Sequence, residues 1–474
     1  MLKINNQSTF NFYIVFSLCI FFVGLVLTEF LGDLQPIMIS FFIMYIYTVI
    51  YSVSSFGWLS LYCIYLYTSA FFIYNCIFLS LLSFSPTSFL FHDFPIRYSF
   101  SEEVGRKFVI SCFLTVFTGH IAFCLFESKK HRCKIIKKKI KYIQKLERIG
   151  SWIFLLSLFP ICYKIFIQLQ FVMTYGFPAV YTSRFEEIQY PIWCTGAFLL
   201  FETGYLIFLA SNPSRQKFIR YTILYFCIAL LNALKGGRGG VVAALIISIY
   251  WYKKRYGMKV NFIKLFSILV LIFFLIAFIT SLRESYEGRR TFLDTNFFDR
   301  IYNILWRGTT SRAVPLLIIQ GDLKYHSFPF IFSPFTDRIF NFIYGYGAAT
   351  FDLIKTYNEP SIVLISNVSL SAGLSGSGYG SAFIGEAYEI GGYFGIILFS
   401  ILFSYFLFFL EEKSFTLKNI YIPLCYTLIS SIPFAPRKEI FQFIRFDLNI
   451  MIVCYTALFM ILFLIRKRKT THEI

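Results

Sequence analysis

The chain has 474 residues, of which 57% are hydrophobic, 21% are aromatic and only 15% are charged. A soluble domain has about 45–50% apolar and about 25% charged residues, so this composition and a mean hydropathy of +0.66 exclude an ordinary soluble protein. The formal net charge of +19 would suggest a nucleic-acid partner, but the cations lie in polar breaks between apolar runs, which excludes that partner.

Apolar runs of the length needed to cross a hydrocarbon core recur along the chain. They predict an all-α polytopic membrane protein with about twelve transmembrane helices in a single integral membrane domain, residues 1–474. The first run, from Phe10 to Leu27, exceeds a signal-peptide core and no small-residue cleavage site follows it, so we expect it to be retained. The predicted spans are 10–28, 35–54, 57–83, 105–126, 150–171, 193–210, 220–234, 239–252, 261–281, 388–410, 419–434 and 447–465.

The basic connectors predict the orientation of these spans. With both termini in the cytoplasm, every charged inner connector satisfies the positive-inside rule, which indicates a multi-pass protein of the cell inner (plasma) membrane. Residues 127–149 then form a basic cytoplasmic loop that faces lipid headgroups. The main outer loops are 172–192 and a large loop, 282–387, whose apolar stretch 361–374 is predicted to be loop, re-entrant or interfacial.

The two faces differ in the type of cation that they carry. In this topology the inner side has 18 Lys and 7 Arg, whereas the outer side has 13 Arg and 5 Lys. A guanidinium presents five donors in a planar fork that binds carboxylate or phosphate bidentately, while Lys acts as a hydrated point charge. The outer face is therefore predicted to bind an anion.

A glycine-rich hairpin contains the first candidate residue. Arg238 is flanked by two glycines on each side, in the sequence Lys-Gly-Gly-Arg-Gly-Gly that joins two predicted spans at the outer surface. Such backbone can turn tightly and expose N–H groups to a diphosphate. The alternative is a plain tight turn with a snorkelling arginine, and the spacing alone leaves both open.

The large outer loop carries seven arginines, and loops of this length are usually functional. Its segment 297–319 has apolar residues at helical spacing, which favours an amphipathic helix on the outer leaflet. Each arginine taken singly could instead be solvated or paired with lipid phosphate. The seven residues are Arg283, Arg289, Arg290, Arg300, Arg307, Arg312 and Arg338.

A segment rich in Gly and Ser, 371–381, leads into a predicted helix that begins with two acids one turn apart. An acid is favoured electrostatically at a helix N-terminus, whereas one buried at membrane depth is costly and usually functional. We favour a functional role, as general base, for Glu386 and a structural role for Glu389. A last outer segment, with Arg437 and Arg445, could complete an anion clamp.

Other kinds of chemistry receive no support from the sequence. The five His residues are scattered, and no zinc spacing, P-loop, dinucleotide fingerprint or nucleophile elbow occurs. The cysteines lie mostly within apolar runs without CxxC spacing and are interpreted as buried apolar residues. We therefore predict no metal and no cofactor.

The spans, the GGRGG hairpin, the Arg-bearing outer loop and the sequence GEAYEIGGYFG at 385–395 together resemble the O-antigen polymerase (Wzy) type of oligosaccharide repeat-unit polymerase. The resemblance implies a fold similar to the C-type glycosyltransferases, shared by polymerases and O-antigen ligases. It implies transfer of a growing glycan from undecaprenyl pyrophosphate to the non-reducing end of a new undecaprenyl-pyrophosphate-linked unit, on the outer face of the inner membrane. A chain-length regulator and a flippase would be its partner proteins.

In this interpretation the enzyme is a metal-independent, inverting glycosyltransferase. Glu386 and Arg238 would be catalytic, with Glu386 accepting the proton of the attacking sugar hydroxyl. Tyr379 and Tyr388 would contact sugar rings. The arginines that would bind pyrophosphate are Arg238, Arg283, Arg289, Arg290, Arg307 and Arg312.

Two alternative functions remain open at this point. O-antigen ligases have a His near the start of the comparable helix, and here about Ser381 takes its place, which disfavours a ligase. A flippase or transporter of lipid-linked oligosaccharide should have internal repeats and charges deep in its spans. We find no repeat, and only Lys164, Glu202 and His120 lie away from the ends of predicted spans, which favours an enzyme with a site on one side.

Overall fold

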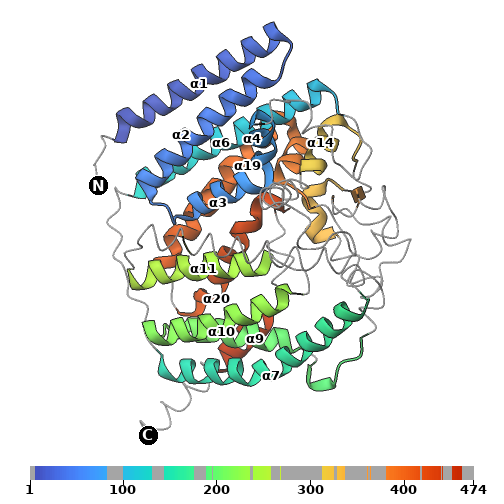
Figure 1. Ribbon diagram of the computed structural model, residues 1–474. Coiled ribbons are helices and arrows are strands. Elements are labelled where there is room, and N and C mark those ends of the chain that lie inside the picture. The colour runs from blue at the N-terminus through green and yellow to red at the C-terminus, as the bar shows by residue number, and fades with distance from the viewer. Residues whose placement is uncertain are drawn as a thin grey trace. The chain divides into compact units, whose positions relative to one another are not determined.

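The computed structural model describes most of the predicted helices and part of the predicted outer loops. The described residues are 6–82, 100–130, 143–175, 188–194, 196–234, 239–257, 267, 312–324, 328–336, 360, 363–364, 380–416, 419–438, 440 and 451–461. They contain helices and no strand, which confirms the predicted all-α fold (Figure 1). The chain divides into two compact units, which are described separately below.

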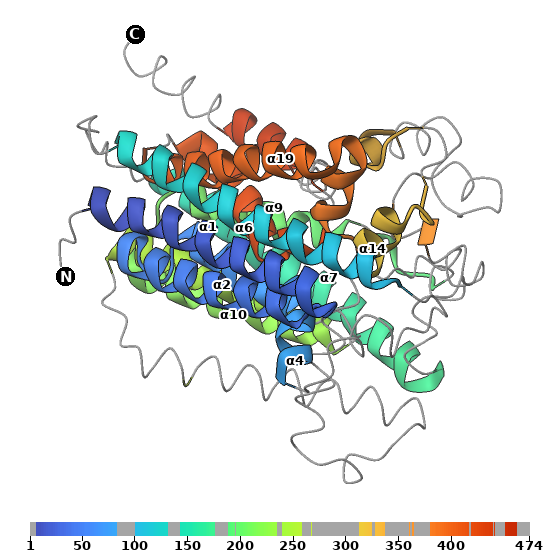
Figure 2. The same cartoon turned by 90° about the horizontal axis from the view of Figure 1, so that it is seen from above.

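The first unit comprises residues Met1–Ile135, Asn303–Phe409 and Ala435–Gln442. Its described elements are α1 (Asn6–Leu31), α2 (Gln35–Phe56), α3 (Leu61–Ser69), the π-helical turn η1 (Ala70–Tyr74), α4 (Asn75–Leu82), α6 (Glu102–Lys130), α14 (Ala313–Gln320), the 3₁₀ turn η5 (Phe330–Phe332) and most of α19 (Phe383–Thr416). Helices α1 and α2 lie side by side and are joined by a short turn (Figure 2).

Small and aromatic side chains build the core of the first unit. A Cβ at Gly24 would overlap the Ser40 hydroxyl, so α1 and α2 approach closely there. The hydroxyls of Tyr13 and Thr48 are 2.9 Å apart, and the Tyr13 ring lies 4.5 Å from the imidazole of His120. His120 is fully buried among aromatic rings, as expected for a histidine that belongs to the helix core.

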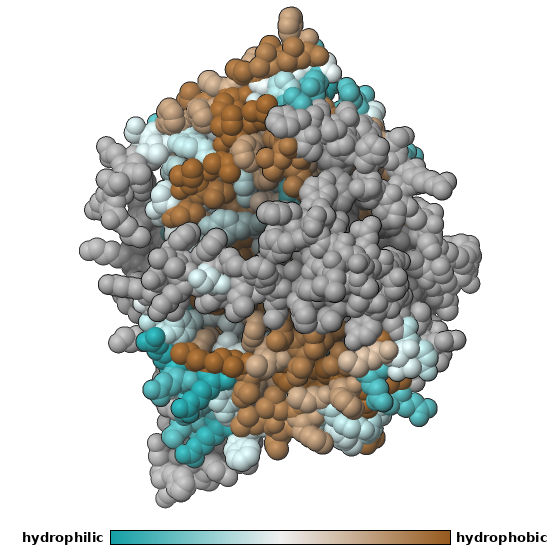
Figure 3. Space-filling view, in the orientation of Figure 1, coloured by the Kyte–Doolittle hydropathy of each residue, from teal (hydrophilic) through white to brown (hydrophobic). Residues whose placement is uncertain are grey.

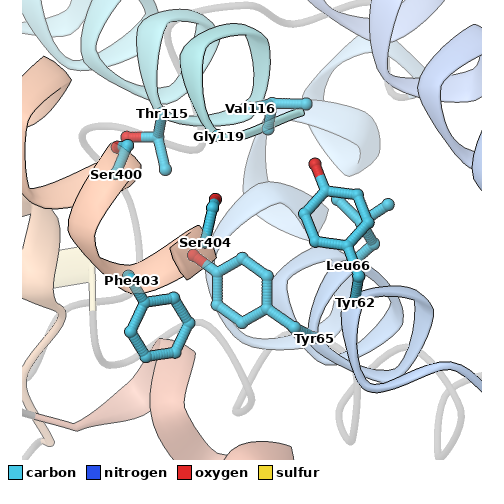
Figure 4. A pocket seen from close by; sticks show the side chains of 9 residues that line it. All are labelled: Tyr62, Tyr65, Leu66, Thr115, Val116, Gly119, Ser400, Phe403 and Ser404. Atoms are coloured by element: carbon cyan, nitrogen blue, oxygen red, sulfur yellow. The ribbon is translucent and has the colours of Figure 1, made fainter. Parts of the chain in front are cut away.

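Helices α3, α6 and α19 meet around a small cavity of about 10 Å³ (Figure 4). A Cβ at Gly119 of α6 would lie 3.1 Å from the Ser404 hydroxyl of α19, which explains the close contact of these two helices. Hydroxyls of Tyr65, Thr115 and Ser404 border the cavity, whose size approaches that of one water site.

The second unit comprises residues Ile136–Tyr302, Leu410–Phe434 and Phe443–Ile474. Its described elements are α7 (Gln144–Tyr175), the 3₁₀ turn η3 (Ile192–Cys194), α9 (Ala197–Ala210), α10 (Arg215–Ala233), α11 (Gly239–Tyr256), the end of α19, the 3₁₀ turn η6 (Asn419–Tyr421), α20 (Ile422–Ser431), the beginning of the 3₁₀ segment η7 (Ile432–Arg437) and a helix at Met451–Ile461. Helix α7 packs most extensively on α9, and α10 packs on α11.

Two glycines allow the close packing of α7 and α9. A Cβ at Gly150 of α7 would lie 2.5 Å from the backbone nitrogen of Phe208, and a Cβ at Gly204 of α9 would lie 2.5 Å from that of Phe154. Small residues at helix crossings in membranes let the backbones pack in van der Waals contact. The pair of glycines therefore determines the spacing of the helices that carry Lys164 and Glu202.

Replacing Gly204 by Ala is expected to destabilise the protein by about 1–3 kcal/mol, because the added methyl group meets backbone atoms that cannot rotate away. Thermal unfolding of the purified protein in detergent measures the effect as a lower midpoint. An unchanged midpoint would contradict the close approach of α7 and α9.

Seven described helices are long and apolar enough to cross a membrane, which confirms a multi-pass membrane protein. They are Ser8–Leu31, Gln35–Phe56, Leu61–Leu82, Glu102–Ser128, Gln144–Tyr175, Ile192–Ala210 and Phe383–Ser414. Helices α10, α11 and α20 and the helix Met451–Ile461 lie at four further predicted spans, and the span 261–281 falls almost wholly outside the described residues.

Large apolar side chains remain exposed on the described helices. Phe22 and Phe30 of α1 are 69% and 83% exposed, and Phe159 of α7 is 70% exposed. Broad apolar areas are visible on the molecular surface (Figure 3). Such side chains are stable when they face lipid acyl chains, in agreement with the membrane location.

Candidate active site

The candidate site in the first unit is built around a short helix at the start of α19. Residues 383–390 are helical, and the helix then breaks at Gly391 (φ −158°, ψ 25°) and Gly392 (φ 56°, ψ −135°) before it resumes. The backbone at Gly392 is one that L side chains rarely adopt. A Cβ at Gly395 would overlap the carbonyl oxygen of Ala387. Residues 391–395 therefore form a kink, whereas the sequence predicted one continuous span over 388–410.

Glu386 lies on this short helix with its side chain fully buried. The Ser381 hydroxyl donates to Glu386 Oε1 over 3.3 Å, and the backbone N–H of Ile440 donates to Oε2 over 3.0 Å. Glu386 is therefore a buried acid, as the sequence predicts. Its two hydrogen bonds join the short helix to Ser381, which precedes α19 in the chain, and to Ile440, which follows it.

Glu389, one turn further along, has a comparable partner and is less buried. Its Oε2 accepts the backbone N–H of Phe330 over 2.9 Å, which holds η5 against the short helix. This contact agrees with the structural role expected for Glu389. The two acids therefore join two separate segments, at 330 and at 440, to the same short helix.

Arg312 is the one pyrophosphate-binding candidate whose position is described, and its side chain is only 1% exposed. It directly precedes α14 and lies next to the thiol of Cys76 on α4. Helix α14 packs closely on the short helix, because a Cβ at Gly385 would lie 2.9 Å from Pro315 Cα. The described part of 297–319 is therefore a buried helix, where the sequence favoured one on the outer leaflet.

Arg437 is a second cation of this region. Gly380 has φ +79°, and a Cβ there would lie 2.9 Å from Arg437 Nε, so glycine gives the guanidinium room beside the chain entering the short helix. The guanidinium carbon is also 5.8 Å from the ring centroid of Phe72, within cation–π range. Phe72 belongs to the π-helical turn η1, and π-helical turns are frequent at functional sites.

Tyr388, a predicted sugar contact, is half-buried on the same short helix. Its ring packs edge to face against Tyr393 with centroids 5.7 Å apart. The first unit thus brings Glu386, Arg312, Arg437 and Tyr388 onto or around one helix start. The other predicted site residues lie outside the described part of the chain: Arg238, Arg283, Arg289, Arg290, Arg307 and Tyr379.

Two partners of Glu386 were not assigned a role by the sequence. Ser381 stands at about the position of the His found in O-antigen ligases. Its hydrogen bond to Glu386 shows that a side chain at this position contacts the candidate base. The Ile440 amide is a backbone group of a distant segment, and no side-chain pattern marks it. Within the described residues, no group of three or more His, Cys, Asp and Glu side chains could hold a metal ion.

The helices define an integral membrane protein in which a buried carboxylate, the buried Arg312 and the half-buried Arg437 lie around one helix start. The family model for the O-antigen polysaccharide polymerase Wzy matches residues 9–469, and the chain belongs to this family. The general role is therefore that of an O-antigen polymerase, a glycosyltransferase-type enzyme acting on lipid-linked oligosaccharide repeat units. The comparisons with curated proteins and with solved structures give no match.

Proposed function

We propose that the protein transfers the growing glycan from undecaprenyl pyrophosphate to the non-reducing end of a new undecaprenyl-pyrophosphate-linked repeat unit, on the outer face of the membrane. A hydroxyl oxygen of the new unit attacks the anomeric carbon of the growing chain. The bond from that carbon to the pyrophosphate oxygen breaks, and undecaprenyl pyrophosphate leaves with the electron pair. A single displacement of this kind inverts the anomeric configuration.

Glu386 is the proposed general base, which accepts the proton of the attacking hydroxyl. The observation that supports this role is its burial together with two donors, Ser381 and the Ile440 amide, that hold both oxygens in place. A carboxylate oriented in this way can accept a proton from a hydroxyl within hydrogen-bond reach. Because the carboxylate is already positioned before the substrate binds, less free energy is needed to reach the reactive geometry.

Arginines are proposed to stabilise the departing pyrophosphate. A glycosyl pyrophosphate already carries a good leaving group, so the enzyme has to hold charge that grows as the bond breaks. Arg312 and Arg437 are on elements that contact the chain around Glu386, which supports this assignment. We further propose that Arg238 and the outer-loop residues Arg283, Arg289, Arg290 and Arg307 contribute, and that no metal ion takes part.

The test is a gel profile of surface polysaccharide from a strain that lacks the gene and carries a wild-type or variant copy. A polymerase defect leaves the acceptor capped with a single repeat unit. Acceptor without any repeat unit would instead indicate a ligase or a flippase, and an unchanged ladder would exclude all three functions. Purified protein with lipid-linked repeat units should still form polymer in EDTA, and loss of polymer there would contradict the metal-independent mechanism.

Arg238→Lys is expected to lower polymerisation by about 10- to 100-fold, because an ammonium group keeps the charge but loses the bidentate fork. The same gel profile, with protein amounts matched by immunoblot, measures the change. Arg215→Lys serves as the control, since Arg215 lies at the inner end of α10 in the predicted topology. Full activity of Arg238→Lys would contradict bidentate binding by this residue.

A further inference from the structure

The second unit contains a partly open cavity of about 490 Å³ that the proposed reaction does not use. Helices α7, α9 and α10 and the start of α11 form its walls. This volume falls within the range of about 300–1,000 Å³ that is usual for small-molecule sites. Apolar and aromatic side chains alternate there with five polar ones: Lys164, Gln168, Glu202, Tyr225 and Asn232.

The polar side chains of this cavity are held by contacts with their neighbours. The Tyr225 hydroxyl lies 2.9 Å from one Glu202 oxygen and 3.1 Å from the other, and it donates its proton to this carboxylate. The Tyr225 ring stacks on Tyr205 with centroids 4.3 Å apart. Such support positions the carboxylate before a ligand arrives.

Tyr190 fixes the two polar residues of α7. Gln168 Nε2 donates to the Tyr190 hydroxyl over 2.9 Å, and Lys164 Nζ lies 4.9 Å from the centroid of the Tyr190 ring. Burial raises the pKa of Tyr190, which keeps its phenol neutral. Lys164 and Gln168 are four residues apart and therefore lie on the same face of α7.

In the predicted topology the cavity lies nearer the outer ends of its helices than their inner ends. Glu202 is five residues after Ala197, where α9 begins, and Tyr225 is eight residues before the end of α10. At 1.5 Å per residue these positions are about 8 Å and about 12 Å from the outer ends of their helices. Asn232, which precedes the glycine-rich hairpin in the chain, and Gly240, its last glycine, also line the cavity.

We propose that this cavity binds a sugar residue of the lipid-linked repeat unit, an inference that rests on the proposed function. One cation and one carboxylate balance each other in its lining, which disfavours a diphosphate but suits a saccharide with many hydroxyls. The Glu202 carboxylate can accept hydrogen bonds from sugar hydroxyls. The side-chain amides of Gln168 and Asn232 can both donate and accept hydrogen bonds. The exposed ring of Phe198 also lines the cavity and offers a surface for the apolar side of a pyranose.

Charged groups at this depth in a membrane protein are costly and are usually retained for function. Lys164 and Glu202 lie within the helices Gln144–Tyr175 and Ile192–Ala210, both long and apolar enough to span a membrane. A saccharide site explains why α7 and α9 keep an ammonium and a carboxylate facing the same cavity.

The test is a binding measurement on the purified full-length protein in nanodiscs with two probes. One probe is the free repeat-unit oligosaccharide, released from its lipid pyrophosphate, and the other is undecaprenyl pyrophosphate. Glu202→Gln keeps an oxygen that can accept from Tyr225, and Gln168→Ala removes an amide. Each is expected to weaken oligosaccharide binding by about tenfold and to change undecaprenyl pyrophosphate binding less than about twofold.

Gln170→Ala is the matched control, because Gln170 is exposed on the same helix and should leave both affinities unchanged. Thermal unfolding must give midpoints for the variants close to that of the wild type. Unchanged oligosaccharide affinity in both variants, an equal loss for undecaprenyl pyrophosphate, or no saturable oligosaccharide binding to the wild type would each overturn the proposal.

A polymerisation assay on the same purified protein distinguishes failure of the cavity proposal from failure of the proposed reaction. If Glu202→Gln weakens oligosaccharide binding while the wild type forms no polymer from lipid-linked units, the cavity site stands and the polymerisation mechanism fails. If the wild type forms polymer and the two cavity variants bind oligosaccharide normally, the cavity proposal fails alone.

Discussion

Replacing Glu386 by Gln is expected to lower polymerisation by about 10²–10⁴-fold, the usual contribution of a general base. The amide has nearly the same shape as the carboxylate, and its oxygen can still accept the N–H of Ile440. The variant should therefore fold and reach the membrane while losing the group that takes the proton. The surface polysaccharide should stop at a single repeat unit.

Glu389→Gln is the matched control for this experiment. Glu389 lies one turn away on the same helix and also accepts a backbone N–H, from Phe330, but it is proposed to act only in structure. Its variant should keep the polymer ladder. A full ladder with Glu386→Gln would remove Glu386 as the base, and loss of the ladder with Glu389→Gln alone would assign the role to Glu389.

Replacing Gly395 by Ala is expected to abolish polymerisation and to destabilise the protein by about 1–3 kcal/mol. The new methyl group would overlap the Ala387 carbonyl oxygen, which is backbone and cannot move without displacing the short helix. That helix carries Glu386, so its displacement would disturb the contacts with Ser381 and Ile440. Thermal unfolding and the polysaccharide profile measure the two effects together.

Gly391→Ala provides the control within the same kink. The φ of −158° at Gly391 lies outside the left-handed region that favours glycine, and a Cβ there meets only Phe394 Cδ1, at 3.9 Å. This variant should retain wild-type stability and a polymer ladder. If Gly395→Ala were as stable and active as Gly391→Ala, the close approach of the two helical segments would be wrong.

The helices were predictable from the sequence because lipid imposes a simple rule: a span needs about twenty apolar residues with its backbone bonded internally. Irregular turns and breaks within an apolar helix could not be predicted, because the residues there are as apolar as those of the regular helix on either side. The span expected at 57–83 contains the π-helical turn Ala70–Tyr74, and the helix beginning at Phe383 breaks at Gly391 and Gly392.

The candidate site was predictable in part. Glu386 could be singled out because an acid buried at membrane depth is costly and usually functional, and the structure buries it fully. Arg312 was one of seven loop arginines with no feature to distinguish it, and only its packing beside Cys76 separates it from a solvated residue. The Ile440 amide was beyond prediction, because backbone groups carry no signature in the sequence.

The sequence by itself determined the membrane class, the helical fold and the family, since each depends on properties repeated along the chain or on short motifs. Only the tertiary structure decided which polar groups meet. It placed Ser381, Ile440 and Glu386 together in one unit, and Lys164, Glu202 and Tyr225 around one cavity in the other. The contact between Ile440 and Glu386 and the grouping of Lys164 with Glu202 join residues far apart in the chain, and tertiary packing selects them in a way that local periodicity does not encode.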